Sequence, residues 1–127
     1  MITAETIAAF LRKLDAEATC NSSGDEWTFA NGESVYRCTA SARRVAEEFG
    51  GRVVGFYSED NPTAEIADGE DGHDFAIIAD RFVVDYWAAC AAGVIDRPVF
   101  DLSDANDCAT VLRLYGPKDA WKSMSAK

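Results

Sequence analysis

The sequence has no apolar run long enough to cross a membrane, which takes about 20 residues in a helix. Its first residues, 1–5, also place no basic cluster ahead of an apolar stretch, as a secretory signal would. We therefore expect neither a membrane span nor a signal peptide. The expected location is the cytoplasm, or outside the cell after export as an effector without a signal peptide.

Basic residues are few. The chain has 12 Lys and Arg against 22 Asp and Glu, which gives a net charge of −10. Nucleic acids and anionic membranes are bound through positive patches, so this balance argues against both as direct partners. It permits a basic protein partner. A non-enzymatic acidic binder, such as an immunity protein, an inhibitor of a basic enzyme or a phage-type DNA mimic, is therefore one functional class to consider.

The cysteines lack the spacing of a zinc site. None of the four, Cys20, Cys38, Cys90 and Cys108, stands in a C-x-x-C pair. In a reducing compartment we expect free thiols, and we expect Cys20, Cys90 and Cys108 to be structural residues of the buried type. The acidic run ahead of the histidine lacks the spacing and the glycine of an EF-hand loop. We therefore expect no metal and no cofactor.

The sequence does contain enough apolar material for one core. Its 127 residues, 48% of them hydrophobic, suit a single domain over 1–127. Residues 3–18 predict an amphipathic helix with Thr3 as its cap. The buried face of this helix is expected to hold Ile7, Phe10, Leu11 and Leu14. A second helix is expected over 38–49, ended by a Gly-Gly pair.

Runs of β-branched and aromatic residues predict a sheet beside these helices. A strand is expected at 52–57, and a β-hairpin at 74–78 and 82–87 around a turn at 79–81. The remaining expectations are a long loop over 19–37 with a short strand or buried anchor at 27–29, a surface loop over 58–72, a short helix over 88–92, extended pieces at 94–95 and 98–100, a helical turn at 104–108 and a tail that is helical around Trp121. Residues 110–115 fit either a last strand or a continued helix. The fold class expected is α+β.

Three residues have the types and positions that nucleophilic catalysis needs. Cys38 opens the second predicted helix, where free N–H groups and the helix dipole favour a thiolate and can hold an oxyanion. His73, the only histidine, heads the hairpin and would carry the proton of the thiol. Asp85, on the second strand, would hold the imidazole in its working tautomer.

The register of the hairpin decides whether His73 and Asp85 meet. An odd-numbered loop such as 78–80 pairs them directly, on one face, with β-carbons about 5 Å apart. A two-residue loop at 79–80 pairs His73 with Tyr86 instead, and Asp85 then shares a face with Asp74. The sequence leaves both registers open.

The order of these residues resembles the papain-like and transglutaminase-like superfamily of cysteine enzymes. The resemblance covers roughly residues 36–87 and rests on Cys38 and on the segments 73–78 and 82–87. It implies a papain-like fold, in which a helix opened by the Cys packs on a small antiparallel sheet. It also implies that Cys38 is the nucleophile, that the histidine is the base and that Asp85 is the orienting acid.

The resemblance also implies an activity. Members of the superfamily include peptidases, cell-wall amidases, deamidases and toxin effector domains of bacteria, so we expect a hydrolase or acyltransferase acting on an amide of a protein or peptide. Papain has a Gln before the Cys as oxyanion donor; this chain has no Gln, and Asn31 is the nearest amide. The residues expected to line the substrate cleft are Trp27, Tyr36, Tyr86 and Trp87. The alternative is the acidic binding protein, on its own fold or on a papain-like scaffold that has lost activity.

Overall fold

The computed structural model of the protein describes residues 1–67 and 71–124. Its helices are α1 (Ala4–Glu17), α2 (Cys38–Phe49) and α3 (Ala105–Tyr115). Its strands are β1 (Thr19–Cys20), β2 (Trp27–Thr28), β3 (Arg52–Tyr57), β4 (Gly72–Ile78), β5 (Phe82–Val84), β6 (Val99–Asp101) and β7 (Lys122–Ser123). Short helical turns occur at η1 (Ser58–Asp60), η2 (Glu65–Ala67), η3 (Trp87–Ala91, a π-helical turn) and η4 (Lys118–Ala120).

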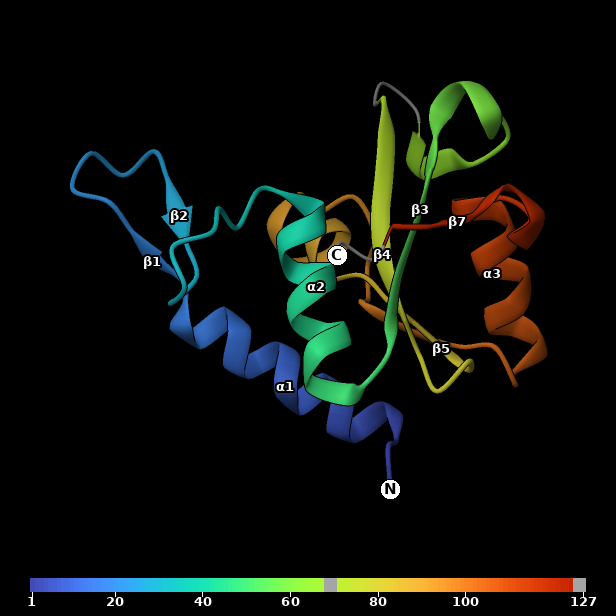
Figure 1. The fold of residues 1–127 in the computed structure, drawn as a ribbon, viewed down its shortest axis with the longest axis horizontal. Helices are drawn as coiled ribbons and strands as arrows, with labels where there is room; N and C mark the ends of the chain where they lie inside the picture. Colours follow the sequence, from blue (N-terminus) through green and yellow to red (C-terminus); the bar gives the residue numbers. More distant parts are fainter. Residues whose placement is uncertain (68–70, 125–127) are drawn as a thin grey trace.

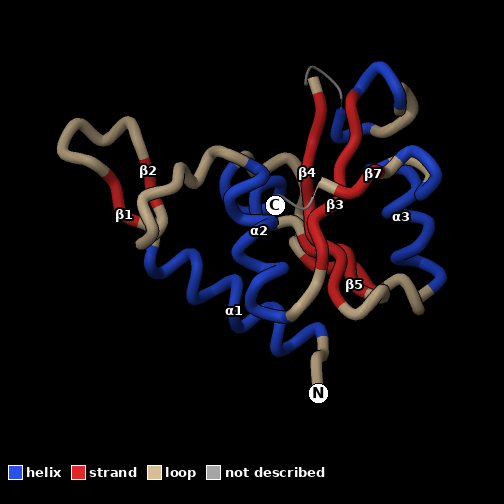
Figure 2. The backbone as a smooth tube through the Cα atoms, viewed as in Figure 1, coloured by secondary structure: helices blue, strands red, loops and turns tan. Residues whose placement is uncertain are grey.

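An antiparallel sheet of five strands forms the centre of the fold, in the order β6-β5-β4-β3-β7. Helices α1 and α2 lie on one side of it and α3 lies on the other (Figure 1). Strands β1 and β2 pair separately, as a small ribbon beyond the end of α1 (Figure 2). The expected α+β class is confirmed. No helix in the described part of the chain has the length and apolar character of a membrane span.

Both faces of the sheet carry an apolar core, because alternate residues of each strand point to opposite sides. On β4, Ala76 and Ile78 pack with α1 and α2, whereas Phe75 and Ile77 pack with α3. The predicted apolar face of α1 is buried in the first of these cores, and the side chain of Thr3 caps the helix as expected. Burial of each such large apolar side chain contributes about 1.5–3 kcal/mol.

The hairpin turn falls at residues 79–81 as predicted, but neither of the two registers considered for His73 and Asp85 forms. Ile78 pairs with Phe82, and the turn is a three-residue loop at 79–81. Ala79 and Asp80 both have positive φ, 56° and 51°. Residues other than Gly seldom adopt this backbone conformation, and the sequence does not indicate it. Because the loop has an odd number of residues, His73 and Asp85 still lie on the same face of the hairpin, although the two residues are not directly paired.

The structure also decides between alternatives in one less regular segment and adds elements in others. Residues 110–115 are helical, because α3 starts at its cap Asp104 and runs without a break to Tyr115. The tail contributes β7, an edge strand, after the turn η4. The loop predicted over 58–72 contains the turns η1 and η2, and its residues 68–70 lie outside the described part of the chain.

Candidate active site

Cys38 is the first residue of α2, as the sequence predicts. The next residue ties this end of the helix to the sheet, since Thr39 Oγ1 donates to Asp74 Oδ2 on β4 at 2.5 Å. Asp74 and His73 are neighbours on that strand, so this bond also brings the start of α2 to the level of the histidine. Cys38 is half-buried there.

His73 and Asp85 meet inside the protein. The two atoms His73 Nε2 and Asp85 Oδ2 lie 2.6 Å apart, and only 2% and 1% of the two side chains is exposed. Asp85 reaches this position because β5 ends at Val84 and the chain turns into η3, with the Asp85 backbone N–H donating to the carbonyl of Pro98. The structure therefore brings together the base and the orienting acid that the sequence analysis named.

The carboxylate of Asp85 is held by two further donors. Tyr115 Oη donates to Oδ2 at 2.8 Å, and the backbone N–H of Ala88 donates to Oδ1 at 3.0 Å. Burial and the charge of Asp85 raise the pKa of Tyr115 well above its ordinary value, so the phenol keeps its proton. Tyr115 was not predicted from the sequence, because its contact with Asp85 depends on where α3 packs, and no local sequence pattern indicates that contact.

Aromatic rings surround the imidazole. The Trp87 ring centroid is 5.1 Å from that of His73, and the rings of Phe75 and Tyr115 stack against it at 6.0 and 6.1 Å. Trp87 is fixed in turn, because its Nε1 donates to the carbonyl of Tyr36 at 2.8 Å. These contacts leave the ring of His73 little freedom to turn away from Asp85.

The electrostatics of the site favour a charged histidine. Burial alone lowers the pKa of His73, but the charge and the hydrogen bond of Asp85 raise it, and a hydrogen bond and charge interaction with Cys38 raise it further, to about 10. The imidazolium form has two N–H donors. Nε2–H serves Asp85, which leaves Nδ1–H for the sulfur of Cys38.

A groove of about 410 Å³ is lined by residues of α1, of the segment ahead of α2 and of the segment after β5. Three of the residues predicted to line a substrate cleft, Trp27, Tyr36 and Tyr86, do line this groove. The fourth, Trp87, packs on His73 and binds Tyr36 instead. The groove also contains Asp15 of α1, which the sequence analysis did not single out and which accepts a bond from Tyr86 Oη at 2.9 Å.

The remaining predicted residues lie in other surroundings. The side-chain amide of Asn31 donates to Glu33 Oε1 at 2.8 Å, and its side-chain oxygen accepts from the Glu33 backbone N–H. Both polar groups of this side chain are therefore used within the local turn. The expectation that Cys20, Cys90 and Cys108 are buried is wrong, because all three are exposed. Of the four cysteines, Cys38 alone is half-buried as a residue.

Within residues 1–67 and 71–124, no group of three His, Cys, Asp or Glu side chains is placed to hold a metal ion. Cys38, His73 and Asp85 bring a thiol, an imidazole and a carboxylate together in series. Comparison of the chain with family models, with curated proteins and with solved structures finds no match.

Proposed function

We propose that the protein is a cysteine-dependent hydrolase or acyltransferase that acts on an amide bond of a protein or peptide. Cys38 is the nucleophile, His73 moves the proton and Asp85 holds the imidazole. The observation that carries this proposal is the buried 2.6 Å contact of His73 with Asp85, beside a cysteine that opens a helix. A buried imidazolium costs too much without charged partners to be a common packing solution.

The reaction follows from the positions of these groups. The Cys38 thiolate attacks the carbonyl carbon, and the carbonyl π-electrons move to oxygen. The imidazolium of His73 gives its Nδ1 proton to the leaving nitrogen, the C–N bond breaks, and a thioester remains on Cys38. Neutral His73 then takes a proton from water, or from an acceptor amine, as that nucleophile attacks the thioester. The thiolate leaves and the starting charges are restored.

The same proposal assigns the oxyanion to the start of α2. The first N–H groups of a helix have no carbonyl four residues earlier to bind, and those of α2 begin at Cys38. These N–H groups take the oxyanion role expected of Asn31, whose side-chain amide is bound to Glu33. A helix opened by the nucleophile and packed on an antiparallel sheet supports a papain-like arrangement. The substrate is met in the cytoplasm, or after export of the protein as an effector.

An acyl-transfer assay with p-nitrophenyl acetate tests the proposal, because this ester acylates reactive thiols without a specific recognition site. We expect a burst of p-nitrophenol, an acetyl group on Cys38 in peptide mass spectra, and slow turnover. Cys38→Ser should abolish the burst, while the control Cys20→Ser, at an exposed thiol outside the groove, should keep it. Acetylation of the exposed cysteines as fast as Cys38 would contradict the proposal and favour the acidic binding protein.

A further inference from the structure

Asp15 is a carboxylate that lines the groove. Its Oδ1 accepts from Tyr86 Oη at 2.9 Å, but no Lys, Arg or His within the described ranges forms an ion pair with it. Glu17, one half-turn further along α1, is by contrast bound through both carboxylate oxygens to Arg44. The fold has thus neutralised one of two neighbouring carboxylates and left the other facing the groove.

The walls around Asp15 are of the kind that binds cations. Trp27 and Tyr36 line the groove and are 40% and 50% exposed, so their rings are available to a ligand. Aromatic faces attract ammonium and guanidinium groups, and a carboxylate beside them adds a counter-ion. The local field is negative as well: burial, followed by the charges of Asp15 and Asp85, raises the pKa of the Cys90 thiol at the same groove.

Two residues that line the groove are close to triad residues in the chain. Tyr36 lies two residues before Cys38 in the chain, and Tyr86 directly follows Asp85. The two walls are joined by Trp87, which donates to the Tyr36 carbonyl and packs on His73. A peptide whose scissile carbonyl sits at Cys38 therefore has a neighbouring side chain within reach of this groove.

We infer that the groove is a specificity site for a basic side chain of the substrate, with Asp15 as its counter-ion. The methylene stem of a Lys or Arg lies along Trp27 and Tyr36, and its charged end meets the carboxylate. This inference deepens the proposed function and rests on it, because it names the substrate class as peptides that carry a Lys or Arg near the amide attacked by Cys38.

Peptide binding to the Cys38→Ala protein tests the inference without relying on catalysis. The two probes are acetyl-Gly-Lys-Gly-amide and its norleucine analogue, which has a similar stem and no charge. Binding is followed by NMR through the indole N–H of Trp27. We expect the Lys peptide to bind about tenfold more tightly, from one partly exposed ion pair and one cation–π contact.

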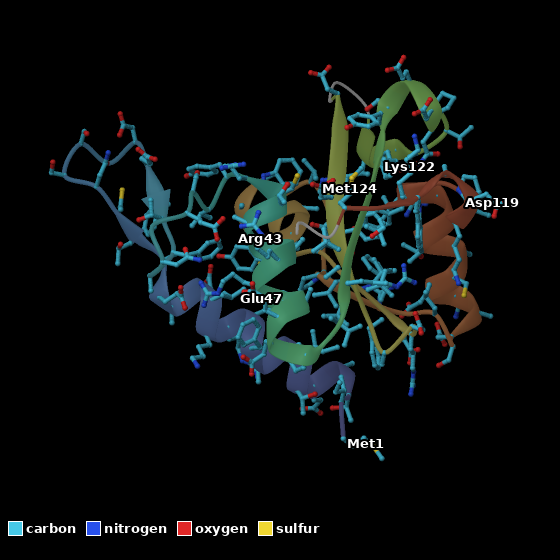
Figure 3. The ribbon with its side chains drawn as sticks, in the orientation of Figure 1. Met1, Arg43, Glu47, Asp119, Lys122 and Met124 are labelled. Atoms are coloured by element: carbon cyan, nitrogen blue, oxygen red, sulfur yellow. The ribbon has the colours of Figure 1, made fainter. Side chains whose placement is uncertain are left out.

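Substitution of the carboxylate gives the matched comparison. Asp15→Asn keeps an oxygen for Tyr86 Oη and should reduce the preference for Lys by about threefold or more. Asp119→Asn removes the same charge from an exposed site beside α3, on the opposite side of the molecule from α1 (Figure 3), and should leave the preference unchanged.

Two failures are distinguishable. Equal binding of the two peptides, or a preference for Lys that survives Asp15→Asn, overturns the specificity site, whether or not Cys38 is a reactive nucleophile. A preference that depends on Asp15, in a protein whose Cys38 is neither acylated nor alkylated faster than its exposed thiols, supports the basic-side-chain site and contradicts the proposed catalysis.

Discussion

Replacing Asp85 by Asn should turn the charged histidine into a neutral one. The substitution keeps the shape of the side chain and removes the charge that, together with its hydrogen bond, raises the pKa of His73. What remains is the burial of His73, which lowers the pKa, and the interaction with Cys38, which raises it and is absent from a Cys38→Ala protein. In a protein that lacks both partners, we expect the pKa of His73 to fall below its ordinary value of 6.5, so that the imidazole loses its charge at pH 7.

NMR measures this pKa without ambiguity, since His73 is the only histidine in the chain. The imidazole carbon and nitrogen shifts, followed from pH 5 to 10, report its protonation directly. The Cys38→Ala protein is the background of choice, because an ordinary thiol titrates near 8.5, inside the same range. Asp85 remains the strongest source of the raised pKa in this background.

The same shift has a consequence for stability. A histidine whose pKa is raised in the folded state stabilises it fully below pH 6.5, and this contribution is lost as pH rises toward the folded-state value. Over that range the free energy of unfolding of Cys38→Ala should fall by about 1.4 kcal/mol per pH unit. In Cys38→Ala with Asp85→Asn, the decrease should vanish. Urea denaturation at several pH values gives both slopes.

A His73 that titrates near 6.5 in Cys38→Ala, or an Asp85→Asn substitution that leaves the pKa of His73 unchanged, would show that Asp85 does not raise this pKa. Loss of one partner of a buried pair costs about 3–5 kcal/mol, so the Asn variant is also expected to be less stable. If it does not fold, the slope of Cys38→Ala alone still decides whether the histidine is protonated.

Two further perturbations test the surroundings of the site. Tyr115→Phe removes the 2.8 Å bond to the buried Asp85 carboxylate and should lower the free energy of unfolding in urea by about 1.5–3 kcal/mol; the exposed Tyr36→Phe should change it by less than about 0.5 kcal/mol, and equal effects would argue against the bond. Glu17→Gln should cost about 1 kcal/mol at pH 7, because the hydrogen bonds from Arg44 lower the pKa of Glu17 to about 2. This contribution is present above pH 4.5 and lost as pH falls through 2, so a cost that persists at pH 2 would contradict the assignment.

Periodicity was enough to predict the main elements. Helices α1 and α2 and strand β3 occupy the expected segments. The pattern that predicts a buried helical face or a β-branched strand lies within one continuous stretch of sequence. The short edge strand β7 was missed, since its pairing depends on where the tail returns to the sheet. The hairpin turn at 79–81 was predicted, but the positive φ of Ala79 and Asp80 was not, because neither residue is a glycine.

The residues of the site also differ in whether a local sequence pattern predicts them. Cys38, His73 and Asp85 were found because each stands at the end of an element where its chemistry has a reason to be. Tyr115 and Asp15 were not, because α3 and α1 bring them to the site from distant parts of the chain. The exposure of Cys20, Cys90 and Cys108 contradicts the usual burial of free cysteine, which residue type alone does not reveal.

Activation of Cys38 by His73 can be measured as the rate at which iodoacetamide alkylates each cysteine at pH 6, followed by peptide mass spectrometry. We predict that Cys38, the least exposed of the four, reacts at least about tenfold faster than the other thiols. His73→Ala, with its fold checked by circular dichroism, should remove that advantage. A Cys38 that reacts no faster than Cys20 and Cys108, or at a rate indifferent to His73→Ala, would contradict the account.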